Sequence, residues 1–126
     1  GDRGVGARPG GTPGYMSPEQ IGNRVTDLDT RSDVYGLGAT LYECLTLRCP
    51  FEADSREELY RQIRTTEPPN PRRLNPQVSR DLRAVVEKAL EKDERRRYAS
   101  AAELASDIRR YLSHQPIEAH PPSTTP

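Results

Sequence analysis

One stretch of the sequence constrains the fold more than any other. Residues 31–47, Arg-Ser-Asp-Val-Tyr-Gly-Leu-Gly-Ala-Thr-Leu-Tyr-Glu-Cys-Leu-Thr-Leu, are the longest mostly apolar run in a very polar chain. Wound at about 3.6 residues per turn, the run places Val34, Leu37, Leu41, Cys44 and Leu45 on one face, and Tyr35, Ala39, Tyr42 and Leu47 on the others. A helix that is apolar nearly all round has neighbours on several sides, so the stretch predicts a buried central helix.

The residues at the ends of this stretch are typical of helix boundaries. Thr30 is predicted as the N-cap, with Asp33 completing an acidic variant of the capping box and facing the positive end of the helix dipole. Pro50 ends the element. Gly36 and Gly38 each cost roughly 1 kcal/mol against alanine in a helix, and their closeness indicates that a neighbouring segment packs against the backbone here.

Further segments carry the signals of amphipathic helices. In a capping box, a serine and a Glu or Gln three residues later each accept a hydrogen bond from the other's backbone amide, and such pairs begin at Ser17, Ser55 and Ser100. The first predicts a single helical turn, and the others predict helices over 55–65 and from 100 to 112. A third helix is predicted over 79–91, where apolar residues follow the spacing i, i+3, i+4, i+7, i+8: Leu82, Val85, Val86, Ala89 and Leu90.

The remaining segments are predicted to be connections. Residues 1–11 contain five glycines and no apolar periodicity, which is typical of a flexible loop. Residues 67–76 contain four prolines and are predicted as an extended linker. Residues 113–126 are rich in Pro, Ser and Thr and are predicted to be disordered. The expected fold is therefore mostly α, with a central buried helix and surrounding amphipathic helices.

Composition limits the classes of function. The chain has 126 residues, and its 19 basic residues balance its 19 acidic ones, which gives no argument for nucleic acid or an anionic membrane as a partner. No apolar run approaches the length of a membrane span. Cys44 and Cys49 lack the spacing of a disulfide framework or a metal site. Reduced thiols, and with them a cytoplasmic location, are expected.

Three blocks of sequence occur in an informative order. Residues 11–19 read Gly-Thr-Pro-Gly-Tyr-Met-Ser-Pro-Glu, residues 33–38 read Asp-Val-Tyr-Gly-Leu-Gly, and residues 93–97 read Asp-Glu-Arg-Arg-Arg. They resemble the substrate-site loop, the Asp-x-Trp-x-x-Gly signature and the Asp-Pro-x-x-Arg turn of the C-terminal lobe of a protein kinase. Tyr35 stands in place of tryptophan and Glu94 in place of proline. The Gly-Thr pair, together with Gln20 after the glutamate, resembles bacterial serine/threonine kinases.

The resemblance implies a role for the residues that match each block. Thr12 is expected to hydrogen-bond the catalytic aspartate and to help select Ser/Thr acceptors. Gly14 and Tyr15 are expected to shape the pocket beside the phosphoacceptor. Asp33 is expected to accept backbone hydrogen bonds from the catalytic loop. Taken alone, Thr12 would be an ordinary turn residue, and Asp33 would simply compensate the helix dipole.

The resemblance also places Glu19 against Arg97 as a buried structural ion pair. A guanidinium presents a planar fork that can hold a carboxylate through two hydrogen bonds. Arg95 and Arg96 are the competing partners. If all three arginines were solvated, any such pair would contribute only roughly 0–1 kcal/mol.

The parts of a kinase that carry out the chemistry have no match in this sequence. A kinase needs a strand lysine, a His-Arg-Asp loop with a later Asn, and Asp-Phe-Gly for magnesium. Here the lysines are Lys88 and Lys92, the histidines lie in the tail, and the one phenylalanine, Phe51, follows a proline. No catalytic, cofactor-binding or metal-binding residue is therefore predicted, and the chain alone is expected to be inactive.

The expected organisation is a partial kinase domain. Residues 1–11 would be a flexible remnant of the activation segment, 12–112 the kinase C-lobe, and 113–126 a linker, beyond which the parent could be membrane-anchored. The resemblance implies ATP and Mg²⁺ for the full-length parent, protein substrates as its partners, and the missing N-lobe and catalytic loop as partners of this lobe. Two alternatives remain open: a degenerate, non-catalytic kinase lobe that docks proteins, and a truncated gene product without a function of its own.

Overall fold

The structure, a computed structural model, describes residues 13–22 and 30–119. Within these ranges helices are the only regular elements: η1 (Pro13–Tyr15), α1 (Pro18–Ile21), α2 (Thr30–Thr46), α3 (Arg56–Thr65), α4 (Pro71–Leu74), α5 (Arg80–Ala89), η3 (Glu94–Arg96) and α6 (Ala101–Leu112). The predicted mostly α fold is confirmed. None of the helices in the described ranges has both the length and the apolar character needed to cross a bilayer.

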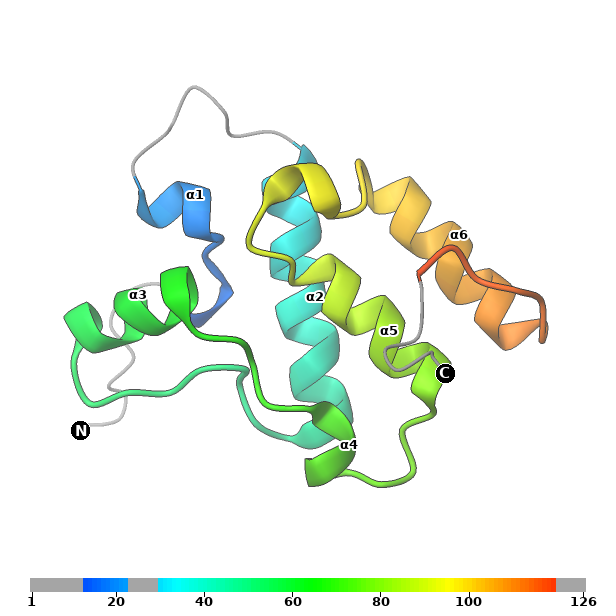
Figure 1. Ribbon diagram of the computed structural model, residues 1–126, viewed down its shortest axis with the longest axis horizontal. Coiled ribbons are helices and arrows are strands. Elements are labelled where there is room, and N and C mark those ends of the chain that lie inside the picture. The colour runs from blue at the N-terminus through cyan, green and yellow to red at the C-terminus, as the bar shows by residue number, and fades with distance from the viewer. Residues whose placement is uncertain (1–12, 23–29, 120–126) are drawn as a thin grey trace.

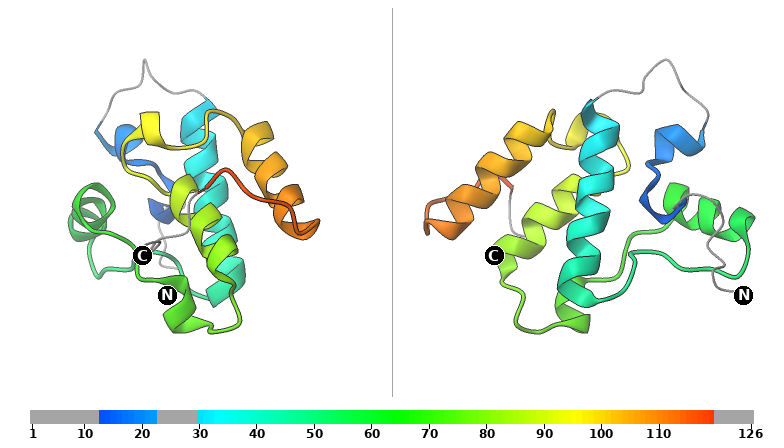
Figure 2. Two further views of the ribbon diagram at one scale, coloured as in Figure 1. Left: turned by 45° about the vertical axis from the view of Figure 1, so that its right-hand side comes forward. Right: turned by 180° about the vertical axis from the view of Figure 1, so that it is seen from behind.

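Helix α2 is the axis of the molecule. Helices α5 and α6 pack on one side of it, and η1, α1 and α3 lie on the other, with α4 beside its C-terminal end (Figure 1). Figure 2 shows the same division from behind, where α3 and α6 stand at opposite edges. Because α2 touches both groups, it joins the segment 13–22 to the helices that follow much later in the chain.

Two apolar clusters meet on α2. The first fills the space between α2, α5 and α6, and comprises Val34, Ala84, Val85, Ala89, Tyr98, Leu104 and Ala119. The second lies toward α3, and comprises Tyr35, Ala39, Tyr42, Phe51, Ile63, Val86 and Leu90. The predicted buried central helix is therefore present, with its neighbours on two sides.

The apolar residues of α2 are not all buried. Leu37 is 46% exposed and Cys44 is also exposed, whereas the rings of Tyr35 and Tyr42 are 1% and 0% exposed. Helical periodicity could not rank the faces of a run that is apolar all round. The described neighbours cover two sides of α2, and the rings of Tyr35 and Tyr42 lie on the side toward α3.

Both ends of α2 also differ from the prediction. Thr30 is the first helical residue, not the N-cap, and its hydroxyl donates to the carbonyl oxygen of Ala99 at 2.7 Å. At the other end the helix stops at Thr46, and Leu47 adopts a left-handed φ of 64°. The hydroxyl oxygen of Thr46 accepts from the Arg48 amide at 3.1 Å, so the turn is closed before Pro50 is reached.

The two glycines of α2 have different surroundings. A Cβ added at Gly38 would lie 2.7 Å from the Cβ of Ala89 on α5, closer than side chains tolerate. A Cβ added at Gly36 would meet nothing nearer than the Tyr15 carbonyl oxygen at 3.6 Å. The close approach inferred from the sequence therefore occurs at Gly38 alone.

The three predicted serine caps are present: the side chains of Ser17, Ser55 and Ser100 each accept from a backbone amide three residues later. Ser79, which was not predicted as a cap, does the same at the start of α5. The segment 67–76 is not wholly extended, because Asn70 caps the short helix α4 and Pro71 occupies its first position.

The tail after α6 also departs from the prediction. Residues 113–119 fold back onto the helices, and Ala119 is 3% exposed in the first cluster, so the expected disorder does not begin at 113. His114 has a left-handed φ of 61°, and the Gln115 amide donates to the Arg110 carbonyl at 2.8 Å, which reverses the chain at the end of the helix.

Candidate functional site

The segment 13–22 begins the site, and its geometry follows from its sequence. The Ser17 hydroxyl oxygen accepts from the Gln20 amide at 3.3 Å, and the Gln20 side chain accepts from the Ser17 amide at 2.8 Å, which completes the predicted capping box. Pro18 fits the first helical position because its missing N–H needs no partner there. This turn directs Glu19 into the interior, where it is 1% exposed.

Glu19 and Arg97 form a bidentate ion pair inside the protein. Nη1 of Arg97 lies 2.7 Å from Oε2 of Glu19, Nη2 lies 3.0 Å from Oε1, and both side chains are fully buried. The Ser32 hydroxyl donates a further hydrogen bond to Oε2 at 2.8 Å. The predicted partner is thus Arg97, while Arg95 pairs with Asp93 in solvent.

Arg97 is satisfied at every N–H. Besides the two bonds to Glu19, Nε donates to the Glu91 carbonyl at 2.9 Å, Nη1 to the Arg31 carbonyl at 2.8 Å, and Nη2 to the Lys92 carbonyl at 3.4 Å. The guanidinium carries five N–H donors, and each therefore has an acceptor. Its carbon also lies 5.3 Å from the centre of the Tyr35 ring. One side chain thus joins α1, α2 and the turn after α5.

The charge of Glu19 is stabilised by this environment. Burial alone would raise the pKa of the carboxyl, but the hydrogen bonds from Arg97 and Ser32 and the positive charge of Arg97 outweigh it and lower the pKa to about 2. The pair therefore stays ionised at neutral pH, as a buried carboxylate and a buried guanidinium that neutralise each other.

Two more contacts hold the segment before Glu19. The Tyr15 hydroxyl donates to Oε1 of Glu43 on α2, and the Tyr60 hydroxyl of α3 lies 3.9 Å from the sulfur of Met16. A Cβ added at Gly14 would lie 4.0 Å from the sulfur of Cys49, an ordinary contact. The segment is therefore fixed between α2 and α3, and sterics alone do not require glycine at position 14.

The other predicted site residues are not brought into this arrangement. Thr12 lies outside the described residues. Asp33 is exposed in the first turn of α2. The catalytic loop expected to contact both residues has no counterpart in the sequence. Their expected roles in selecting the acceptor and anchoring that loop stay predictions.

The acidic residues and the lysines of the described ranges bear on nucleotide and metal binding. Among them no group of three or more His, Cys, Asp or Glu residues is placed to hold a metal ion. Lys92 donates to the Ile63 carbonyl at 2.6 Å and lies 4.8 Å from the centre of the Phe51 ring, and burial lowers its pKa. Lys88 lies 5.2 Å from the centre of the Tyr98 ring. Both lysines therefore serve the packing of the described helices.

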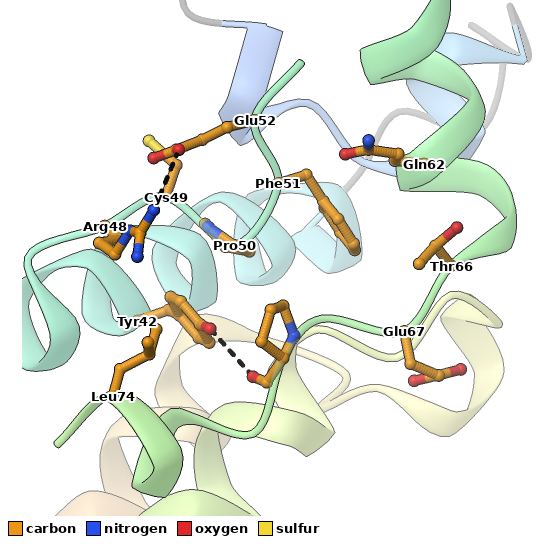
Figure 3. A pocket seen from close by; sticks show the side chains of 11 residues that line it. Tyr42, Arg48, Cys49, Pro50, Phe51, Glu52, Gln62, Thr66, Glu67 and Leu74 are labelled. Atoms are coloured by element: carbon orange, nitrogen blue, oxygen red, sulfur yellow. Dashed lines mark hydrogen bonds and ion pairs between the residues drawn. The ribbon is translucent and has the colours of Figure 1, made fainter.

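A pocket of about 330 Å³ opens between the C-terminal end of α2 and α3. Figure 3 shows Phe51, Pro50 and Cys49 along one side and Gln62 and Thr66 across from them. The Tyr42 hydroxyl closes the floor by donating to the Pro69 carbonyl at 2.9 Å. The polar groups along its rim are already paired in part, as in the ion pair of Arg48 with Glu52 at 3.9 Å.

Several residues that hold these segments in place carry no signal in the sequence patterns above. Ser32 and Glu43 were passed over because a serine or a glutamate within a helix has no signature of its own. Asp107, which is 0% exposed and receives four hydrogen bonds, is also absent from the predicted residues. Its position beside Leu104 and Ile108, on the apolar side of the helix, was the available signal.

Comparisons with known proteins agree with this geometry. The family model described as the protein kinase domain matches residues 7–110. The chain is 46% identical over 109 residues to the serine/threonine-protein kinase PknB of Mycobacterium leprae, covering 86% of this chain and 17% of that protein. It is 42% identical over 109 residues to a probable serine/threonine-protein kinase of Streptomyces coelicolor, covering 86% and 16%.

Solved structures are similar as well. A crystal structure of the Rad53 kinase domain and SCD2 in complex with AMPPNP superposes with a TM-score of 0.61 at 26% identity, covering 74% of this chain and 36% of that one. A second crystal structure of the same domains has a TM-score of 0.59 and covers 72% and 32%. The chain thus spans less than one fifth of the two bacterial relatives named above and about a third of the solved chains.

Proposed function

Because this chain belongs to the protein kinase domain family, we propose that it is the substrate-side helical lobe of a serine/threonine protein kinase. The parent reaction is the transfer of the γ-phosphoryl group of ATP, with Mg²⁺, to a protein hydroxyl. The observation that carries the proposal is the buried pair of Glu19 and Arg97. It fixes the segment that resembles the family's substrate-site loop to the body of the lobe.

Positioning is the contribution this lobe would make to the reaction. Catalysis of phosphoryl transfer depends mostly on placing the groups and on electrostatic stabilisation. The capping box at Ser17, the ion pair of Glu19 and the hydrogen bond from Tyr15 to Glu43 hold the segment 13–22 at three points. A rigid segment of this kind can hold an acceptor peptide at one distance from the reacting centre. Gly14 and Tyr15 would lie beside the acceptor.

The remaining parts of the active site would come from other segments of the parent. ATP and Mg²⁺ would be bound there, and they supply the phosphoryl group and the neutralising charge when present. The exposed face of α2 around Leu37 and Cys44 is the surface on which the catalytic loop and its preceding helix would pack. Asp33 would then accept the backbone hydrogen bonds of that loop, and Thr12 would meet its aspartate.

The test uses the native protein that contains this chain. With labelled ATP, Mg²⁺ and a basic protein substrate, we expect label on serine and threonine, and none from the 126-residue chain alone. Tyr15→Phe removes the hydrogen bond to Glu43 and should lower kcat/KM for the protein substrate without changing KM for ATP. Tyr111→Phe on α6 is the matched control, because α6 and the segment 13–22 lie on opposite sides of α2.

Two results would contradict the proposal. The first is a native protein that transfers no label above background, which would favour the protein-docking alternative. The second is transfer by the pure 126-residue chain, which would mean that the reacting groups lie in this lobe. The kinase names of the relatives give no support to the docking alternative.

A further inference from the structure

The carboxylate of Asp107 is the centre of a second buried polar cluster. Its side chain is fully buried and receives four hydrogen bonds. The Tyr98 hydroxyl donates to it at 2.6 Å, Arg110 Nη1 at 2.8 Å, and the backbone amides of Glu118 and Ala119 at 2.7 and 3.0 Å. Two of the four donors thus belong to the tail after α6, which this carboxylate binds through its backbone.

The tail is also held by apolar contacts. Ala119 is 3% exposed within the first cluster, and Ile117 packs against the same residues. Figure 1 shows the segment after α6 turning back along that helix. The matched region of the kinase family model ends at residue 110, so this docked segment, residues 117–119, lies beyond it.

The cluster is connected to the candidate site through one turn. Tyr98 directly follows Arg97, and the two side chains are 1% and 3% exposed. Arg97 points to Glu19 on one side of the turn, and Tyr98 points to Asp107 on the other. Since consecutive residues share a backbone, fixing the Tyr98 ring limits the positions that the Arg97 guanidinium can take.

We propose that residues 117–119 are a strap that holds Asp107 and, through it, Tyr98. Tyr98 lies in the same turn as Arg97, and Arg97 holds the segment 13–22 through Glu19. Asp107 is then a positioning residue. It contacts no reacting group, but its loss loosens a segment on the far side of α2. In a longer protein, whatever pulls on the chain after residue 119 would act on this strap. The inference concerns the fold and does not rest on the proposed catalytic function.

The experiment is amide hydrogen exchange, read by mass spectrometry, on the native protein that contains this chain. Asp107→Asn replaces an acceptor oxygen with an NH₂ group that faces other donors. Ala119→Glu pushes the strap out from its own side and leaves Asp107 and Tyr98 intact. Asp54→Asn, an identical exchange at an exposed residue before α3, is the matched control.

Both variants should speed exchange in the peptide 115–119 by roughly ten- to one-hundred-fold, the factor for one hydrogen bond to a charged group. Smaller but reproducible increases are expected in the peptide 16–22 and in the α5 peptide 82–89, because Val85 and Ala89 share a cluster with Ala119. Asp54→Asn should leave all three peptides unchanged. Unchanged exchange at 115–119 would overturn the strap itself, and faster exchange at 115–119 without any at 16–22 would overturn its link to the substrate-site segment. An equal increase in all three peptides would mean general unfolding and would also overturn the proposal.

Discussion

Removing one partner of the Glu19–Arg97 pair should be among the costliest single changes in this protein. Arg97→Met leaves a fully buried carboxylate whose remaining side-chain donor is the Ser32 hydroxyl. Glu19→Gln leaves a buried guanidinium facing a neutral amide. In either variant a charge stays inside the protein without its counter-charge, and a loss of this kind costs about 3–5 kcal/mol.

The lowered pKa of Glu19 reflects the same contacts and corresponds to a stability contribution of similar size. A fall from the ordinary value of 4.5 to about 2 corresponds to about 3 kcal/mol of stability at neutral pH. The sign follows from proton binding: the unfolded chain takes up the proton first, so this contribution is complete above about pH 4.5 and is lost as the pH falls toward 2. The difference between the wild type and Glu19→Gln should therefore shrink over that range.

Urea unfolding of the 126-residue chain, followed by far-UV circular dichroism, measures these changes. Arg97 also donates to three backbone carbonyls, and both Arg97→Met and the double variant Glu19→Gln/Arg97→Met lose these bonds. A double-mutant cycle cancels that shared cost and isolates the pair. We expect a coupling free energy of about 2 kcal/mol or more.

The control is Arg95→Met. Arg95 pairs with Asp93 in solvent with its side chain 82% exposed, so its replacement should change the free energy of unfolding by about 0–1 kcal/mol. A coupling below about 0.5 kcal/mol for Glu19 and Arg97, or equal losses for Arg95→Met and Arg97→Met, would refute the reasoning from burial.

Two further predictions concern α2. Gly38→Ala should lower the free energy of unfolding by about 1–3 kcal/mol, because its Cβ would lie 2.7 Å from that of Ala89. Gly36→Ala should raise the free energy of unfolding by roughly 0.5–1 kcal/mol. Urea unfolding measures both changes, and changes of the same sign would contradict the packing described. The isolated chain should bind a dye that reports exposed apolar surface, because Leu37 is 46% and Leu47 86% exposed. Leu37→Glu should reduce dye binding. A monomer that binds no dye would show that the apolar surface around Leu37 is not exposed to solvent.

Local chemistry made much of the fold predictable. Helices α3, α5 and α6 each begin at a serine whose oxygen reaches a backbone amide three residues later. The short helix α4 carried a similar signal, since Asn70 precedes Pro71, but four prolines in ten residues masked it. Interactions that depend on nearby residues alone could therefore be predicted well.

The packing of the helices and of the tail was harder to predict from the sequence, for two physical reasons. The run 31–47 is apolar on every face, so no pattern within it could say that Tyr35 and Tyr42 would be buried in preference to Leu37. The docking of the tail depends on the backbone amides of Glu118 and Ala119. Every residue except proline has the same backbone amide, so the sequence does not indicate which acceptor these two amides will bind.

The ion pair was found through a motif that this chain matches imperfectly, and the structure shows why the mismatches do not disturb it. Where the family's turn has proline, this chain has Glu94, yet the turn is closed by Asp93, whose carboxylate accepts from the Arg95 amide at 3.0 Å. Where the family has tryptophan, the ring of Tyr35 still lies beneath the Arg97 guanidinium at 5.3 Å. At both changed positions another group makes the needed contact: Asp93 closes the turn beside Glu94, and the Tyr35 ring lies against the guanidinium. Glu19 and Arg97 are both fully buried, so each charge needs the other as its partner, and the two side chains pair in the structure.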